Sequence, residues 1–120
     1  MFSQILQVVI ALGIINVWIF RFGQSTRYRG GNAKNLREEF EEYGLPLWFM
    51  VAIGIGKLTL AALLLAGLWY SWLTLPAAVG MSVLMAGAVA MHIKVGDPAI
   101  KAVPATLMLA MSLFVASINL

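Results

Sequence analysis

The stretch LWFMVAIGIGKLTLAALLLAGL, residues Leu47–Leu68, carries one charged side chain, Lys57, within an otherwise apolar run. Its length matches the ~20 apolar residues that an α-helix needs to cross the hydrocarbon core of a bilayer. Residues Ala61–Leu68 show no alternation of polar and apolar side chains, which argues against a transmembrane β-strand. Gly54 and Ala61 share a helix face with Lys57, so we expect this face to point into a helix bundle.

Three further apolar runs fill most of the remaining chain, so that spans are expected over about 2–20, 47–68, 73–91 and 100–118. The composition is 62% hydrophobic, a value that lipid accommodates better than a soluble core of 120 residues. Backbone polar groups in lipid must be satisfied within helices or closed barrels. The predicted fold class is therefore all-α: a polytopic, antiparallel bundle of four transmembrane helices that forms a single membrane domain over 1–120.

The basic side chains predict the orientation in the membrane. Apart from Lys57, every Lys and Arg lies between spans 1 and 2 or between spans 3 and 4. Cytoplasmic loops carry such an excess, so we expect both termini on the periplasmic side of a bacterial inner membrane. The same argument accounts for the net charge of +3 without a nucleic-acid partner. Because no basic residue precedes Arg21, the first run is interpreted as a retained span rather than a signal peptide.

The polar segment before span 2 predicts a short helix at the membrane surface, over 35–43 (NLREEFEEY). Asn35 is expected to cap it together with Glu38, and Gly44 and Pro46 end it. Three apolar or aromatic side chains share one face, and Arg37 and Glu41 are spaced as an ion pair. The apolar face consists of Leu36, Phe40 and Tyr43. The four glutamates are interpreted as a solvated face, although Glu39 or Glu42 could approach His92 or Lys94.

Lys57 is the first candidate for a ligand site, since an ionisable residue near mid-membrane is costly and marks function by default. It could bind an anionic or carbonyl group, or be held neutral by desolvation. The alternative is that its long side chain reaches polar groups or water at the membrane surface. Gln7 and Asn16 of span 1 lie at similar depth and are candidate hydrogen-bond partners.

His92 and Asp97, in the run MHIKVGDP (Met91–Pro98), are the second candidate. His92 could relay protons, contact a headgroup or ligate a metal or haem, and its alternative is a polar anchor at the membrane surface. Asp97 could share that role, or could simply cap span 4 ahead of Pro98. With no cysteine and one histidine, we expect no metal site. Trp48, Trp69 and Trp72, as well as Trp18 and Tyr43, are expected in the aromatic belts of the membrane interfaces.

Three segments resemble the DoxX-like family of small bacterial membrane proteins: FEEYGLPLWF (Phe40–Phe49), GIGKLTLAALLLAGLW (Gly54–Trp69) and MAGAVAMHIKVGDP (Met85–Pro98). The resemblance implies a four-helix membrane bundle and an association with membrane redox complexes. The family takes its name from a subunit of a thiosulfate:quinone oxidoreductase. The resemblance also singles out Lys57, His92 and Asp97, which match family-like positions.

The first functional hypothesis is therefore that the chain is an accessory subunit of a quinone-linked redox complex. On this hypothesis the subunit is not an enzyme on its own. A quinone is the possible cofactor, and lipid and redox subunits are the partners. A homo-oligomeric transporter or lipid-binding bundle is the second hypothesis. The third is a structural or assembly factor without a small-molecule site.

Overall fold

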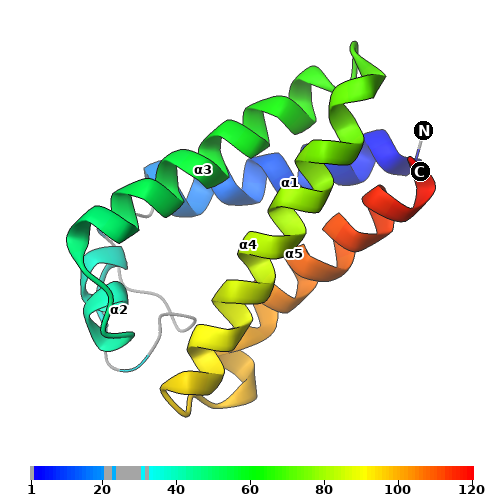
Figure 1. The fold of residues 1–120 in the computed structure, drawn as a ribbon. Coiled ribbons are helices and arrows are strands. Elements are labelled where there is room, and N and C mark those ends of the chain that lie inside the picture. The colour runs from blue at the N-terminus through cyan, green and yellow to red at the C-terminus, as the bar shows by residue number, and fades with distance from the viewer. Residues whose placement is uncertain (1, 21–22, 24–30, 32) are drawn as a thin grey trace.

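Four long helices form the protein, and they agree with the spans expected from the sequence (Figure 1). The computed structural model describes residues 2–20, 23, 31 and 33–120. The first span consists of α1 (Phe2–Ile15) and a π-helical turn η1 (Asn16–Phe20). The others are α3 (Leu47–Ala66), α4 (Thr74–Lys94), which follows a short 3-10 turn η2 (Ser71–Leu73), and α5 (Ala99–Ile118). All four are long and apolar enough to cross a membrane, which confirms the predicted fold class.

The helices close into a ring, because α1 contacts both α3 and α5, while α4 contacts α3 and packs most extensively on α5. Both chain ends lie at one end of the bundle (Figure 1). There Asn119 donates a hydrogen bond of 3.0 Å to the Ser3 hydroxyl, and the rings of Phe2 and Phe114 stack edge to face. The short helix that precedes α3 and the α4–α5 turn lie together at the opposite end.

A buried polar contact joins three helices near the end of the bundle that holds the chain termini. The Gln7 side chain of α1 donates to the backbone oxygen of Leu64 in α3 at 2.8 Å. It also lies 3.5 Å from the hydroxyl of Thr74 at the start of α4. Around it the core is apolar, with Ile10, Leu64 and Met81 fully buried. A side chain inserted here would collide, since a Cβ at Gly67 would meet Thr74 and Gln7.

The short helix predicted over 35–43 is α2 (Leu36–Glu42). As expected, the Asn35 side chain accepts a hydrogen bond from the Glu38 backbone N–H at 2.8 Å, and Arg37 lies 3.7 Å from Glu41. The chain then turns at Gly44, whose φ of +77° lies in the left-handed region that glycine tolerates best. The turn directs the aromatic face of α2 into the bundle, where Phe40 and Tyr43 are buried.

The expectation that Asp97 caps the last helix is wrong. The N-cap of α5 is Pro98, and no side chain bonds the first turn. Gly96 takes a φ of +71° just before it, which closes the α4–α5 turn and points the Asp97 carboxylate back toward α4. The side chain is thereby free to bond His92 instead of its own helix.

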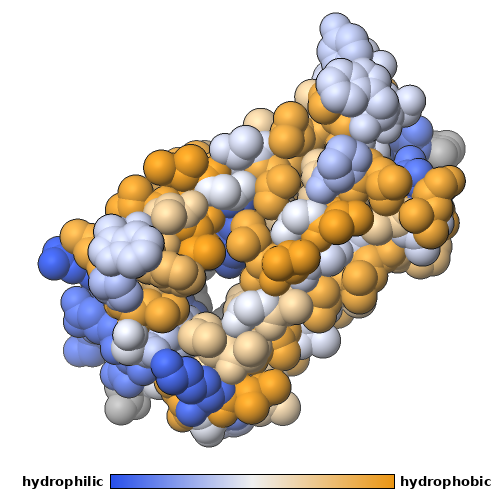
Figure 2. All heavy atoms as spheres, viewed as in Figure 1, coloured by the Kyte–Doolittle hydropathy of each residue, from blue (hydrophilic) through white to orange (hydrophobic). Residues whose placement is uncertain are grey.

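The surface divides along the bundle. Hydrophobic side chains cover the faces of the long helices, and hydrophilic ones gather at the end that carries α2 (Figure 2). Large apolar side chains such as Leu12, Ile55 and Leu107 are exposed on different helices. A surface of this kind is solvated by lipid. The protein is therefore a membrane protein in contact with the bilayer.

Candidate functional site

A cavity of about 670 Å³ lies between α3 and α4, on the α2 side of their contact. Figure 2 shows the surface hollowed between these two helices. Residues from α1, η1, α2 and α5 form the rest of the wall. Most of them are apolar, and the polar or charged side chains in the wall are Asn16, Trp18, Glu39, Tyr43, Lys57, His92 and Lys101.

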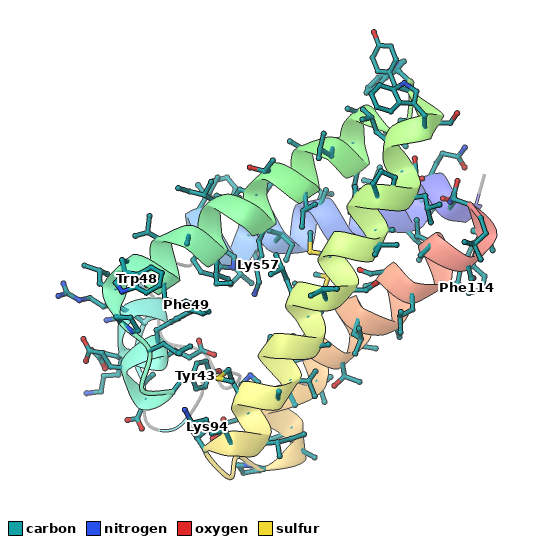
Figure 3. The ribbon with its side chains drawn as sticks, viewed as in Figure 1. Tyr43, Trp48, Phe49, Lys57, Lys94 and Phe114 are labelled. Atoms are coloured by element: carbon teal, nitrogen blue, oxygen red, sulfur yellow. The ribbon has the colours of Figure 1, made fainter. Side chains whose placement is uncertain are left out.

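Lys57 extends from the middle of α3 into the space between α3 and α4 (Figure 3). Its neighbours Gly54 and Ala61 are buried too, so the small-residue face does point inward as expected. Only 9% of the Lys57 residue is exposed, and the described residues offer its ammonium group no hydrogen bond. The contact it does make is to the face of Trp18, whose ring centroid lies 5.4 Å from Nζ. Such a cation–π contact stabilises a cation only in part.

Trp18 is buried rather than part of an interfacial belt, and the π-helical turn η1 explains why. A π-helical turn adds a residue per turn, so it rotates the following side chains relative to α1 and often occurs at functional sites. The Trp18 ring lies directly on Gly54, where an added Cβ would come within 2.6 Å of it. Phe40 meets the same ring edge to face at 5.9 Å. The only sequence signal for this arrangement is Gly54, three residues before Lys57.

His92, near the end of α4, is held from both sides. Its Nδ1 lies 2.7 Å from Oδ2 of Asp97. Its Nε2 faces the cavity wall, where the Tyr43 hydroxyl is 3.4 Å and Oε1 of Glu39 is 3.9 Å away. The Tyr43 hydroxyl donates its proton to Glu39 across 2.6 Å. His92 is 6% exposed. A carboxylate therefore lies near each of its ring nitrogens in a buried position.

Asp97 also ties the loop before α2 to the α4–α5 turn. Its Oδ1 accepts a hydrogen bond of 2.9 Å from the backbone N–H of Gly31, and Lys101 lies 3.9 Å away. Lys101 donates in turn to the backbone oxygen of Gly31. Burial raises the pKa of the Asp97 carboxyl, but the hydrogen bonds from His92 and Gly31 and the electrostatic effects of His92 and Lys101 outweigh it. The net pKa lies below the usual value, and the group is ionised at neutral pH.

The acid that faces the cavity comes from α2, not from any span. Glu39 is buried, so the interpretation of all four glutamates as a solvated face is wrong for this one, while Glu41 and Glu42 are exposed. Its approach to His92, raised as a possibility, is confirmed by the 3.9 Å distance. Glu39 is also close enough to Lys57 to interact with it electrostatically. Lys94 completes this end of the site by donating to the backbone oxygen of Tyr43 at 2.9 Å (Figure 3).

The remaining candidates lie apart from this cluster. Gln7 bonds Leu64 near the other end of the bundle and so does not reach Lys57. Asn16 lines the cavity but is an exposed residue. Trp48, Trp69 and Trp72 are 70–78% exposed and lie outside the cavity wall, a placement compatible with membrane interfaces. In the described part of the chain, no group of three His, Asp or Glu side chains could hold a metal ion.

Comparison with known proteins assigns a family. The family model described as the DoxX-like family matches residues 5–115, which run from the first turn of α1 to the last part of α5. The uncharacterized protein YdgD of Bacillus subtilis (strain 168) is 33% identical over 79 residues, which cover 65% of this chain and 69% of that protein. No solved structure matches.

Proposed function

The chain belongs to the DoxX-like family, and we propose that it is an accessory subunit of a quinone-linked redox complex in the bacterial cytoplasmic membrane. In this proposal the cavity between α3 and α4 binds the quinone. Electron-transfer groups belong to partner subunits, so the chain is a binding subunit and not an enzyme by itself.

The observation that carries the proposal is the Lys57 ammonium group in an apolar cavity of about 670 Å³. Ligand sites are typically of this size, with apolar walls and a few polar groups that fix orientation. A buried cation is costly to keep without a hydrogen-bond acceptor. A quinone supplies carbonyl oxygens as acceptors, a flat ring that fits against Trp18, and an apolar tail.

The position of the hollow supports a lipid-soluble ligand. Exposed residues of α4, Val83 and Gly87, belong to the cavity wall, and both lie well inside the apolar span. A tail could therefore pass between α3 and α4 into the bilayer while the headgroup stays near Lys57. The polar cluster around His92, at the basic end of the bundle, would lie on the side of proton supply.

Quinone binding is the first test. Purified protein in lipid nanodiscs is titrated with decylubiquinone, and quenching of tryptophan fluorescence reports binding. Lys57→Met should weaken binding by about tenfold or more, the loss of roughly one hydrogen bond to a charged donor. Lys34→Met is the matched control, because Lys34 is exposed and lies outside the cavity wall. Equal binding by both variants and the wild type would overturn the role of Lys57.

Partner identification is the second test. Purification in mild detergent, followed by mass spectrometry, should recover a membrane dehydrogenase or quinol oxidase together with quinone. Deletion of the gene should slow the corresponding electron flow. A pure homo-oligomer without quinone, combined with unchanged electron flow, would reject the redox assignment.

A second candidate function is a transporter or lipid-binding bundle that acts as a homo-oligomer. The favouring observation is the same Lys57, because an ammonium group in an apolar cavity also suits the anionic head of an amphiphile. Co-purification of a fatty acid or anionic lipid, in place of a quinone, would select it. If Lys57→Met is more stable and the cavity is always empty, a structural or assembly role is what remains.

A further inference from the structure

The Nε2 nitrogen of His92, which lies beside Tyr43 and Glu39 in the cavity wall, carries chemistry that quinone binding does not use. Asp97 is an ionised carboxylate, so it can only accept a hydrogen bond. At 2.7 Å from Nδ1 it therefore requires the proton of the neutral imidazole to be on Nδ1. The other nitrogen, Nε2, is left with a lone pair directed toward the cavity wall.

Among the described residues, the hydrogen-bond contact of that nitrogen is a long one, to the Tyr43 hydroxyl. The Tyr43 hydroxyl is 3.4 Å away, but its single proton is directed to Glu39 across 2.6 Å. Lys94 belongs to the same helix as His92 and is engaged with the backbone oxygen of Tyr43. A buried acceptor whose contact is this long gains free energy from a shorter hydrogen bond, which a ligand hydroxyl would supply.

We propose that His92 is a base for the ligand in this cavity, and that the ligand class is a lipid-soluble molecule with an acidic hydroxyl, such as a hydroquinone, phenol or enol. The inference rests on the proposed function only in that both use the same cavity. It names the form of ligand that the cavity holds best, the hydroxylated form and not the fully oxidised quinone.

The transfer is a single proton movement. The O–H bond of the ligand breaks, its electron pair stays on the ligand oxygen, and a new N–H bond forms at Nε2 of His92. The imidazolium then lies between the carboxylates of Asp97 and Glu39, at 2.7 Å and 3.9 Å from its nitrogens. The ligand oxyanion shares the cavity with the Lys57 ammonium group. Each charge that appears thus has an opposite charge in the site, and no oxidant or reductant is needed.

The other charged groups around the ring fit this role. Lys101 of α5 lies 3.9 Å from Oδ1 of Asp97, the oxygen that does not meet His92, and donates to the backbone oxygen of Gly31. Glu39 is supplied by α2, Lys57 by α3, and Asp97 by the turn before α5. The two carboxylates that meet this histidine, the only one in the chain, thus come from two different elements.

The single histidine makes a direct test possible on the unaltered protein. In nanodiscs containing ¹⁵N-histidine-labelled protein, the ring nitrogens should give one protonated signal, Nδ1, and one bare signal, Nε2. Addition of a long-chain alkyl nitrophenol should convert the Nε2 signal to the protonated type. The opposite tautomer, or an Nε2 signal that the probe leaves unchanged, would overturn the inference.

The same probe reports from the ligand side, because the nitrophenolate absorbs at a longer wavelength than the nitrophenol. Bound to the wild type, its phenolate band should appear at a pH about one unit below that of the free probe, a tenfold shift in the ionisation equilibrium. His92→Gln should abolish that shift, and Lys34→Met should retain it. The O-methylated probe, which has no proton to give, should bind about tenfold more weakly.

These outcomes separate the inference from the proposed function. If decylubiquinone binds but the nitrophenol stays protonated or does not bind, the inference is wrong and quinone binding stands. If the phenolate forms but no redox enzyme co-purifies, the inference stands and the assignment to a redox complex fails. Should His92→Gln not fold, the ¹⁵N measurement on the wild type decides alone.

Discussion

The carboxylate of Asp97 lies 2.7 Å from the ring of His92 and, through its other oxygen, 2.9 Å from the backbone N–H of Gly31. One side chain thus fixes a histidine in the cavity wall and joins the loop before α2 to the α4–α5 turn. The Asp97–His92 pair therefore connects a residue of the cavity wall with the contact between the loop before α2 and the α4–α5 turn.

Substitution Asp97→Asn should lower stability by about 2 kcal/mol, because the charged acceptor for two hydrogen bonds is lost. Thermal unfolding in detergent, followed by circular dichroism, measures the effect. Glu41→Gln is a suitable control, since its ion pair with Arg37 is 65% exposed on both sides and should contribute little. Equal melting temperatures for Asp97→Asn and the control would contradict the prediction.

Acidification should remove the same contribution. The folded-state pKa of Asp97 lies below its unfolded value, so the stabilisation is complete above the unfolded pKa, near 4, and is lost as the pH falls through the lower folded value. The difference in melting temperature between the wild type and Asp97→Asn should therefore shrink as the pH falls below about 4. A difference that grows below about pH 4 would show that the sign is wrong.

Gly54→Ala should destabilise the fold by about 1–3 kcal/mol, because its Cβ would come within 2.6 Å of the Trp18 ring. Displacement of that ring should also shift the tryptophan emission and weaken ligand binding. Gly87→Ala is the matched control within an apolar span, where nothing lies within 4 Å of an added Cβ. If the two variants melt alike, the ring of Trp18 does not rest on Gly54.

Gln7→Leu should cost about 1–2 kcal/mol, because it removes the donor to the Leu64 carbonyl in the buried contact of three helices. The neighbouring Gln4 is exposed on α1, so Gln4→Leu should be neutral or stabilising in lipid. Neither variant should change ligand binding, since both residues lie outside the cavity wall. Reduced binding by Gln7→Leu at full stability would indicate a coupling that the contacts do not explain.

The orientation of the chain in the membrane can be measured by labelling introduced cysteines. The sequence has no cysteine, so the wild type gives no background labelling. Ser71→Cys and Ala99→Cys place exposed thiols at opposite ends of the bundle. If the basic loops face the cytoplasm, a membrane-impermeant maleimide should label Ser71→Cys in spheroplasts, and Ala99→Cys only after permeabilisation. The reverse pattern would invert the predicted topology.

The sequence predicts the fold well because lipid restricts the choice. Apolar length alone places the four spans, and the spacing of Gly54, Lys57 and Ala61 predicts the inward face of α3 correctly. The Asn35 cap of α2 is equally local and is also predicted. These features depend on residues within one or two helical turns of each other.

Only part of the site could be predicted from the sequence, because the other part depends on tertiary contacts. Lys57 and His92 stand out as polar residues in or near apolar spans, but Glu39 and Tyr43 resemble the rest of a charged surface helix until α2 folds under α3 and α4. Trp18 required a π-helical turn that no local pattern announces. Asp97 matched a capping pattern, and the φ of Gly96 turned it toward a more distant partner.

The hollow between α3 and α4 opens on the side of the bundle that Figure 2 shows. A ligand that enters through this opening binds from the bilayer and not from water. Its effective concentration is therefore its mole fraction in the lipid. Apparent affinities should then vary with the lipid-to-protein ratio even when the amount per volume of solution is fixed. A weak dissociation constant in dilute detergent would correspond to high occupancy in a native membrane that holds the same ligand at a few mole per cent.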